Sequence, residues 1–352
     1  MTDRDQRWAW CEATLPAVSR TFALCIRYLP DDLRRTVTLS YLLCRVADTI
    51  EDASDLAPAR KAELLGLFAG ALDDPAVDLA PLGEAVAGRD DADARLTAEA
   101  DVPVALLHGL PPEVAGAVTP WVREMCQGMA EFATREDAGA RPVPGTLRSL
   151  GSEEDLARYC YFVAGTVGRL LTALFAVQRP GIGARRLARM EELAGDFGEG
   201  LQMVNILADV ARDHARGISY VPESVCRREG LTAAELLAPE NWAEARSVLE
   251  PLIERARRKL AAAREYCQLL PRSEFQLRLF CLIPYFLALR TLRALTEDPR
   301  YPEARQRVKV GRRRVHRTLV AAQFCAASNH LLRAYSRRLD GAVWDSQSLR
   351  SA

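Results

Sequence analysis

Hydrophobic residues recur along most of the chain at the spacing of amphipathic helices. Ala, Leu, Arg and Glu dominate, and no segment shows the sustained apolar/polar alternation of a half-buried strand. The pattern therefore predicts an all-α protein. Long helices are expected at about residues 7–29, 56–73, 114–136, 153–177, 184–213, 241–269, 273–295 and 313–338.

One interior segment lacks this pattern. Residues 74–103 are rich in Asp, Pro and Gly, a composition typical of loops, so we expect a loop there with at most short helical turns. No convincing linker divides the chain, and no repeat has a fixed period. We therefore expect a single domain over residues 1–352, with residues 340–352 as a frayed tail.

Four polar side chains share one face of the apolar helix expected at residues 41–52. At about 100° per residue, Tyr41, Arg45, Asp48 and Asp52 point in nearly the same direction. Leucine, valine and isoleucine surround this stripe, so the helix should be buried on most sides. Burying charge without a partner is expensive, so the carboxylates should face a cation, a cavity or both.

A second apolar helix repeats the arrangement. Gln202, Asn205, Asp209 and Asp213 fall within one sector of the helix over residues 201–213. A single carboxylate pair could be a solvated face or a structural ion-pair acceptor, but two such pairs favour a metal site. Facing each other, they would form a cage of four carboxylates. Mg2+ completes its shell with water and substrate phosphate, so we expect it to bridge a diphosphate there.

The charge balance and the cysteines narrow the possible functions. Lys and Arg together number 47, as do Asp and Glu, so the formal net charge is zero and we expect no nucleic-acid partner. The nine cysteines form no CxxC pair, which favours buried thiols in a reducing cytosol. The four histidines lack metal-ligand spacing, which argues against a zinc site.

The sequence also bears on location. The N-terminus MTDRDQRWAW is charged and lacks the apolar segment of a signal peptide. The longest apolar run, Leu279 to Leu289, is too short to span a bilayer and contains Pro284, so we expect a buried core helix. We expect a soluble, cytoplasmic protein, a monomer or weak homodimer, that could still touch a membrane surface.

Several short blocks, in order, resemble those of the squalene/phytoene synthase family. The resemblance covers about Ser19 to Val315 and implies an all-α isoprenoid-synthase bundle with a central active-site cavity. It also implies head-to-head joining of two prenyl diphosphates through a cyclopropylcarbinyl diphosphate. The blocks are SRTF (19–22), DTIED (48–52), GMAEF (128–132), YCYFVAGTVG (159–168), NILADVARD (205–213), FCLIP (280–284) and KVGRRRV (309–315).

The resemblance implies roles for particular residues. Tyr159 would accept a proton in the first half-reaction, although on sequence alone such a tyrosine is more often a core residue. Arg45 could grip phosphate or form an internal salt bridge to Asp48. The implied Mg2+ ligands, which are also the catalytic carboxylates, are Asp48, Asp52, Asp209 and Asp213. The candidate diphosphate-binding residues are Ser19, Arg20, Phe22, Tyr41, Arg45, Gln202, Asn205, Arg216, Lys309 and Arg312; Asn205, Lys309 and Arg312 are also candidates for NADPH.

Within the family, SRTF, DTIED, GMAEF and FCLIP look most like squalene synthases of the bacterial type, which act on farnesyl diphosphate. Phytoene or dehydrosqualene synthases, which need no NADPH, and hydroxysqualene synthases remain alternatives. Two more remote alternatives are a non-catalytic family member and a class I terpene cyclase. Ala208 stands where the family often has Arg or Lys, and Arg212 where it often has Glu, which changes the positive charge beside the diphosphate.

Overall fold

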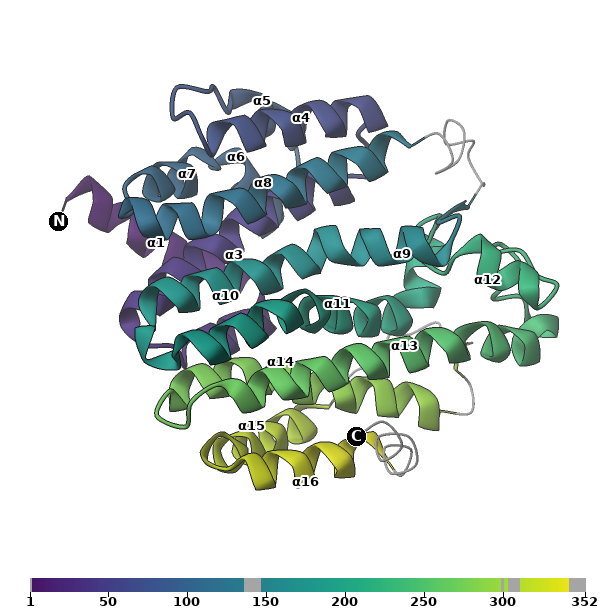
Figure 1. The fold of residues 1–352 in the computed structure, drawn as a ribbon. Coiled ribbons are helices and arrows are strands. Elements are labelled where there is room, and N and C mark those ends of the chain that lie inside the picture. Colours follow the sequence, from purple (N-terminus) through teal and green to yellow (C-terminus); the bar gives the residue numbers. More distant parts are fainter. Residues whose placement is uncertain (1, 136–146, 299–300, 303–310, 342–352) are drawn as a thin grey trace. The chain divides into compact units, whose positions relative to one another are not determined.

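The protein is described by a computed structural model covering residues 2–135, 147–298, 301–302 and 311–341, without the side chain of Arg312 (Figure 1). The described residues are almost entirely helical, which confirms the all-α prediction. Among them, the only strands are β1 (Arg148–Ser149) and β2 (Ile218–Ser219), which pair in parallel.

The chain divides into two compact units. Unit 1 comprises residues 1–135 and 161–191, and unit 2 comprises residues 136–160 and 192–352. The expectation that the whole chain forms one domain stays a prediction.

Unit 1 is built around α3, which buries most of its side chains. Within this unit α8 packs against α3, α4 and α10 (Figure 1). Its elements are α1 (Asp3–Val18), α2 (Arg20–Ile26), α3 (Asp31–Asp52), α4 (Pro58–Ala71), α5 (Ala80–Ala85), α6 (Ala92–Ala98), α7 (Asp101–His108), α8 (Pro112–Thr134), the π-helix η2 (Tyr161–Gly165), α10 (Thr166–Gln178), the 3-10 turn η3 (Pro180–Ile182) and the start of α11 (Ala184–Ala215).

Unit 2 is built around α14, which packs against α13, α15 and α16. Arg278 on α14 is fully buried and donates to the Leu270 carbonyl at 2.5 Å and to Asn329 Oδ1 at 2.6 Å. These bonds hold the α13–α14 connection against the start of α16. The elements are α9 (Glu153–Cys160), the rest of α11, α12 (Glu223–Arg228), the 3-10 turn η4 (Pro239–Asn241), α13 (Trp242–Leu269), α14 (Phe275–Glu297), α15 (Arg312–Ala327) and α16 (Asn329–Asp340).

Two expected helices are each interrupted by a serine. Ser19 separates α1 from α2, and Ser328 separates α15 from α16. Each serine has an extended backbone, and its Oγ accepts a hydrogen bond from the amide three residues later. This is helix N-capping, which starts a new helix in a new direction. The single helices expected at 7–29 and 313–338 are therefore wrong.

The segment at residues 74–103, expected as a loop with at most short helical turns, contains the short helices α5 and α6 and the start of α7. Its aspartates and prolines begin these helices. Asp91 caps α6 by accepting from the Ala94 amide at 2.8 Å, and Pro81 occupies the first turn of α5. Leu82 and Leu96 are buried, so the segment contributes to the core of unit 1.

Two further expectations from the sequence are confirmed. All nine cysteines are buried and none forms a disulfide. The apolar run with Pro284 lies in α14 and is largely buried. By length and composition alone, Glu153–Gln178 and Phe275–Glu297 could cross a membrane, but 61% of the apolar window of the second is buried, as in a core helix. Such windows are weak evidence for a membrane span.

The contact between α8 and η2 depends on one glycine. A Cβ added at Gly128 would overlap the Phe162 side chain, whose ring also packs edge-on against Phe132 at 6.4 Å. Phe162 lies on η2, and π-helical turns are frequent at functional sites. Gly128 therefore lets η2 lie directly against α8.

We expect Gly128→Ala to lower the free energy of unfolding by about 1–3 kcal/mol, because the added methyl group forces Phe162 or the backbone to shift. Gly116→Ala on the same helix is the matched control, since nothing lies within 4 Å of its Cβ position. It should be neutral or stabilising by up to about 1 kcal/mol. Urea unfolding measures both variants, and equal effects would contradict the packing argument.

Candidate active site

The polar stripe of α3 lies on a buried helix, as the sequence predicts. Leu42 and Val46 are fully buried beside it. The Asp48 side chain retains 34% of its accessible surface, while Asp52, at the end of the helix, is exposed. The stripe is thus partly buried at Asp48 and exposed at Asp52.

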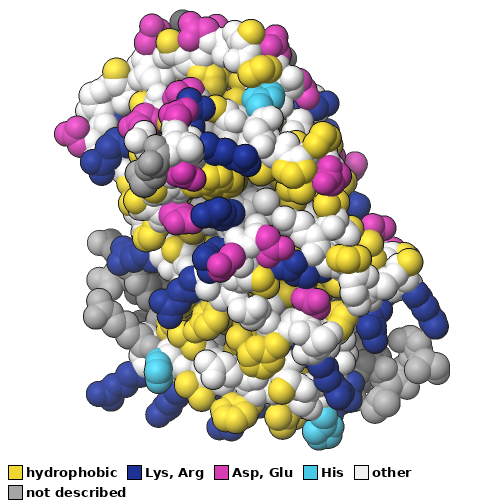
Figure 2. All heavy atoms as spheres, turned by 90° about the vertical axis from the view of Figure 1, so that its left-hand side faces the viewer, with side chains coloured by type: hydrophobic (Ala, Val, Ile, Leu, Met, Phe, Trp, Pro, Cys, Tyr) yellow, Lys and Arg dark blue, Asp and Glu magenta, His cyan; other side chains and the backbone are white. Residues whose placement is uncertain are grey.

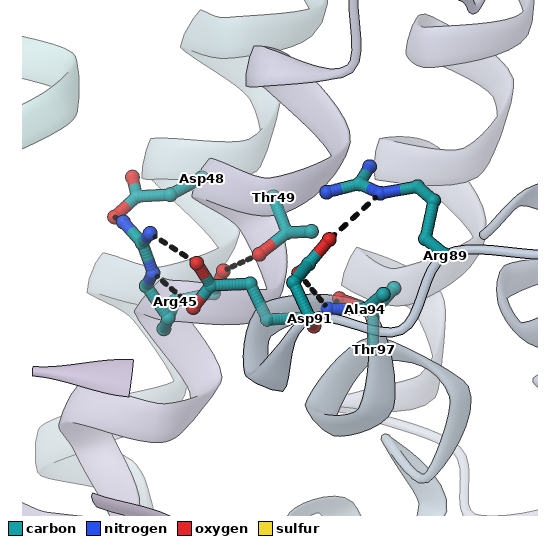
Figure 3. A network of polar contacts seen from close by, with 8 residues as sticks. Arg45, Asp48, Thr49, Arg89, Asp91, Ala94 and Thr97 are labelled. Atoms are coloured by element: carbon teal, nitrogen blue, oxygen red, sulfur yellow. Dashed lines mark hydrogen bonds and ion pairs between the residues drawn. The ribbon is translucent and has the colours of Figure 1, made fainter. Parts of the chain in front are cut away.

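Arg45 forms an ion pair that the sequence did not reveal. Its Nε and Nη2 donate to the two oxygens of Asp93, on α6, at 2.9 and 2.7 Å, whereas its Nη1 lies 3.8 Å from Asp48 Oδ2. Figure 3 shows Arg45 between Asp48 and the α6 turn that begins at Asp91. Both edges of the guanidinium are directed to carboxylates of unit 1. Arg45 therefore fixes two helices together, whatever further contact it makes with phosphate.

The Asp48 carboxyl has a raised pKa. Burial raises its pKa from the ordinary 3.8 to about 7; Asp52 and Asp93 add to the rise, while Arg45 opposes it. About a third of the Asp48 side chain remains accessible, so a ligand can reach the carboxyl although burial disfavours its charged form. A cation beside Asp48 would favour its ionised form, which is the behaviour expected of a metal ligand.

The SRTF block brings an aromatic ring to the same face. Ser19 caps α2, and this turn places Phe22 against Tyr41, with ring centroids 5.4 Å apart. Burial raises the pKa of Tyr41, so its phenol stays protonated at neutral pH. Arg20 is exposed and, within the described part of the chain, has no ion pair. Of the block's three candidate residues, Ser19 has a clear capping role and Phe22 a packing role.

The second carboxylate motif lies on α11 in unit 2. The Asn205 amide donates to Gln202 Oε1 at 3.5 Å, the outer limit of a hydrogen bond. Asp213 is 14% exposed and lies 3.9 Å from Arg216, while Arg212 is exposed. The helical stripe predicted from the sequence is therefore present, and Arg216 is a cation beside it.

Tyr159, on α9, pairs with a tyrosine that sequence reasoning missed. Its ring stacks on Tyr220 with centroids 4.7 Å apart at 25°, and its hydroxyl donates to the Tyr220 hydroxyl at 3.0 Å. Tyr159 is 5% exposed. Tyr220 follows β2 directly, in the YVP run soon after the second motif. Its closeness to that motif in the sequence was the signal that could have identified it as a site residue. The pair fixes both the ring and the hydroxyl of Tyr159.

The carboxylates of the two motifs suit a Mg2+ ion that also binds substrate phosphate better than an ion held by protein side chains alone. Among the described residues, no three His, Cys, Asp or Glu side chains gather as a metal-binding cluster. Mg2+ commonly binds through one or two carboxylates, with waters and substrate phosphates completing its shell. The pair Asp48 and Asp52, one helical turn apart, fits this mode. Lys309 lies outside the described residues, and Arg312 is described only as the first residue of α15.

Comparison with known proteins identifies the family. Residues 15–314 match the squalene/phytoene synthase family, and this chain belongs to it. The squalene synthase of Schizosaccharomyces pombe is 27% identical over 301 residues, covering 86% of this chain and 62% of the relative. Squalene synthase ERG9 of Saccharomyces cerevisiae is 29% identical over 283 residues, covering 80% of this chain and 60% of the relative. The chain thus spans less than two thirds of these relatives.

Solved structures show the same fold. TcSQS in complex with the ligand BPH1237 superposes with a TM-score of 0.79 at 23% identity, covering 97% of this chain and 94% of the other. A dehydrosqualene synthase in complex with a ligand superposes with a TM-score of 0.64 at 21% identity, covering 92% and 97%. The helical isoprenoid-synthase fold expected from the sequence is therefore confirmed.

The raised pKa of Asp48 predicts a pH effect on stability. Without divalent cations, the folded state holds a proton on Asp48 between about pH 4 and 7 that the unfolded chain releases. This carboxyl therefore makes the free energy of unfolding fall as the pH rises through that window. Urea unfolding at several pH values, compared between the wild type and Asp48→Asn, measures the contribution.

Asp48→Asn should remove this part of the pH dependence. Asp55→Asn, which removes an exposed carboxylate just beyond the same helix, should retain it. If the stability of Asp48→Asn varies with pH as steeply as that of the wild type, the Asp48 carboxyl is not desolvated as described.

Proposed function

We propose that the chain is a squalene synthase that joins two farnesyl diphosphates head to head and reduces the product with NADPH. The observation that carries the proposal is the DxxxD face of α3, where a desolvated carboxyl lies on a buried helix beside two further acids. Family membership supports the prenyl diphosphate chemistry, and the relatives named squalene synthases support the choice of substrate.

The first requirement of this reaction is to neutralise a leaving diphosphate. Asp48 and Asp52, with Asp209 and Asp213 of the second motif, would hold Mg2+, which supplies charge neutralisation and orientation of the leaving group. Asn205 and Gln202 offer amide groups on the same face of α11 for hydrogen bonds to phosphate or water. Arg45, held by Asp93, would keep its position as the charge beside it changes.

The second requirement is removal of a proton as the cyclopropane ring closes. We assign this to the Tyr159 hydroxyl, in agreement with the family resemblance. Tyr220 positions it through the stacked ring and the 3.0 Å hydrogen bond. The electron-rich ring face can also stabilise a nearby carbocation. The proton would pass on to the released diphosphate, which is the strongest base formed in this step.

The third requirement is hydride delivery in the second half-reaction. Asn205, Lys309 and Arg312 are our candidates for NADPH. Asn205 is exposed on α11, so its amide can bind a ligand. The two cations come from the basic block that leads into α15, where they could pair with phosphate groups of the cofactor.

The test is incubation of purified protein with farnesyl diphosphate and Mg2+, with and without NADPH, followed by mass analysis. We expect squalene only when NADPH is present. Dehydrosqualene or hydroxysqualene regardless of NADPH would instead assign a non-reducing enzyme. If no C30 product forms, geranylgeranyl diphosphate is the next substrate to test, and inactivity with both would contradict head-to-head synthesis.

Variants in the same assay separate the assigned roles. Asp48→Asn should lower kcat by about 10²–10³-fold, because charge stabilisation of the leaving group is lost. Tyr220→Phe keeps the stacked ring but removes one hydroxyl, so kcat should fall about tenfold with KM little changed. Asp55→Asn should match the wild type. Full activity of Asp48→Asn would contradict its role.

A further inference from the structure

A basic cavity of about 490 Å³ lies in unit 2, among α14, α15 and α16. It is lined by five arginines and the Tyr335 ring, and no described Asp or Glu lines it. The arginines are Arg290 and Arg293 on α14, Arg314 and Arg317 on α15, and Arg338 on α16. The proposed catalytic residues on α11 and α9 do not line this cavity.

The described residues neutralise little of this positive charge. Arg293 pairs with Glu297 at 2.7 Å, but that carboxylate is 61% exposed. Arg290 donates to the Tyr335 hydroxyl at 2.6 Å, and its buried Nε has no hydrogen-bond partner in the described part of the chain. Arg314 and Arg317 have no ion pair with any described residue. An anion in the cavity would therefore relieve both charge repulsion and an unmet hydrogen bond.

The position of the α15 arginines also favours an anion. Arg314 and Arg317 lie in the first two turns of α15, and the first turn holds no acidic residue. The N-terminus of a helix carries partial positive charge, so cations there are unfavourable for the helix itself. These arginines thus cost stability in the isolated chain, and a bound anion would offset that cost.

Exposed apolar side chains continue from the cavity. Val320 lines it and is 42% exposed, and Phe324, one turn further along α15, is 64% exposed. Leu331 is 45% exposed and lies one turn before Tyr335 on α16. At the lower end of the molecule in Figure 2, where α15 and α16 lie, hydrophobic side chains are bordered by Lys and Arg. A water-soluble anion alone would leave this apolar surface uncovered.

We propose that the α15–α16 face is a docking site for a bilayer containing anionic phospholipids. The lipid phosphate binds the arginines of the cavity, while Phe324 and Leu331 enter the boundary between head groups and acyl chains. A basic pocket next to exposed aromatic and aliphatic side chains is the combination that interfacial binding requires. The arginines of the cavity match the lipid phosphate in charge, and the exposed side chains of Val320, Phe324 and Leu331 favour a lipid surface over a water-soluble anion. The proposal does not depend on the reaction that the chain catalyses.

The test is flotation of the full chain with phosphatidylcholine vesicles, with and without phosphatidylglycerol. We expect binding to the anionic vesicles that weakens as salt screens the charges. The double variant Arg314→Glu, Arg317→Glu should lower the partition coefficient at least about tenfold, given roughly 1 kcal/mol for each basic residue near an anionic surface. Phe324→Ser should weaken binding while leaving the net charge unchanged.

Matched controls separate the site from general charge. Arg185→Glu, Arg186→Glu makes the same charge change in the first turn of α11, which also lacks acids, and Val177→Ser removes another exposed apolar residue. Both should bind vesicles as the wild type does. Equal losses in the controls would overturn the proposal. A second result would also overturn it. If calorimetry shows tight binding of inorganic diphosphate, and Phe324→Ser leaves vesicle binding unchanged, the cavity binds a soluble phosphate instead of a lipid.

Discussion

The ion pair between Arg45 and Asp93 fixes the position of the guanidinium that faces Asp48 on α3. Asp93 accepts two hydrogen bonds from the guanidinium and Asp48 has the longer 3.8 Å contact, so Arg45 only partly opposes the rise that burial causes in the pKa of Asp48, to about 7. An arginine committed to Asp48 would instead have lowered that pKa and removed the need for another cation. The fold thus holds a carboxyl whose ionised form is favoured when a cation binds.

The faces of the helices could be predicted from the sequence, but contacts between distant segments could not. The stripes on α3 and α11 follow from helical periodicity, and the structure confirms both. Asp93 was missed because the same Asp, Pro and Gly residues that favour loops also begin short helices. Tyr220 was missed because its partner, Tyr159, lies 61 residues away, a pairing that no local pattern encodes.

Capping explains the errors in helix boundaries. Ser19 and Ser328 lie within continuous helical patterns, where serine is tolerated, so periodicity gave no reason to end a helix. Each is followed by residues that fit a helix equally well. Only the extended backbone at the serine turns the chain, and at Ser19 that turn places Phe22 against Tyr41. A local cap therefore shapes one edge of the candidate active site.

Although the formal net charge is zero, acidic and basic side chains are distributed unevenly over the helices. Carboxylates lie on the separate faces of α3 and α11 that we propose for Mg2+ and diphosphate, and arginines line the cavity of α14, α15 and α16. Around the cavity the described ion pairs leave part of the arginine charge uncompensated, and on α3 the contact between Asp48 and Arg45 is 3.8 Å long. Since such charge costs stability, we propose ligands in both places, a metal-bound diphosphate beside the carboxylates and lipid phosphate beside the arginines.

The most direct test of the central claim is the number of protons released when Mg2+ and an unreactive farnesyl thiodiphosphate bind. Calorimetry in buffers of different ionisation heat, near pH 6, measures this number for the wild type and for Asp48→Asn. The wild type should release close to one proton more than the variant, and the difference should vanish above the Asp48 pKa of about 7. Equal proton release by the two proteins, or binding that is independent of Mg2+, would contradict the role assigned to Asp48.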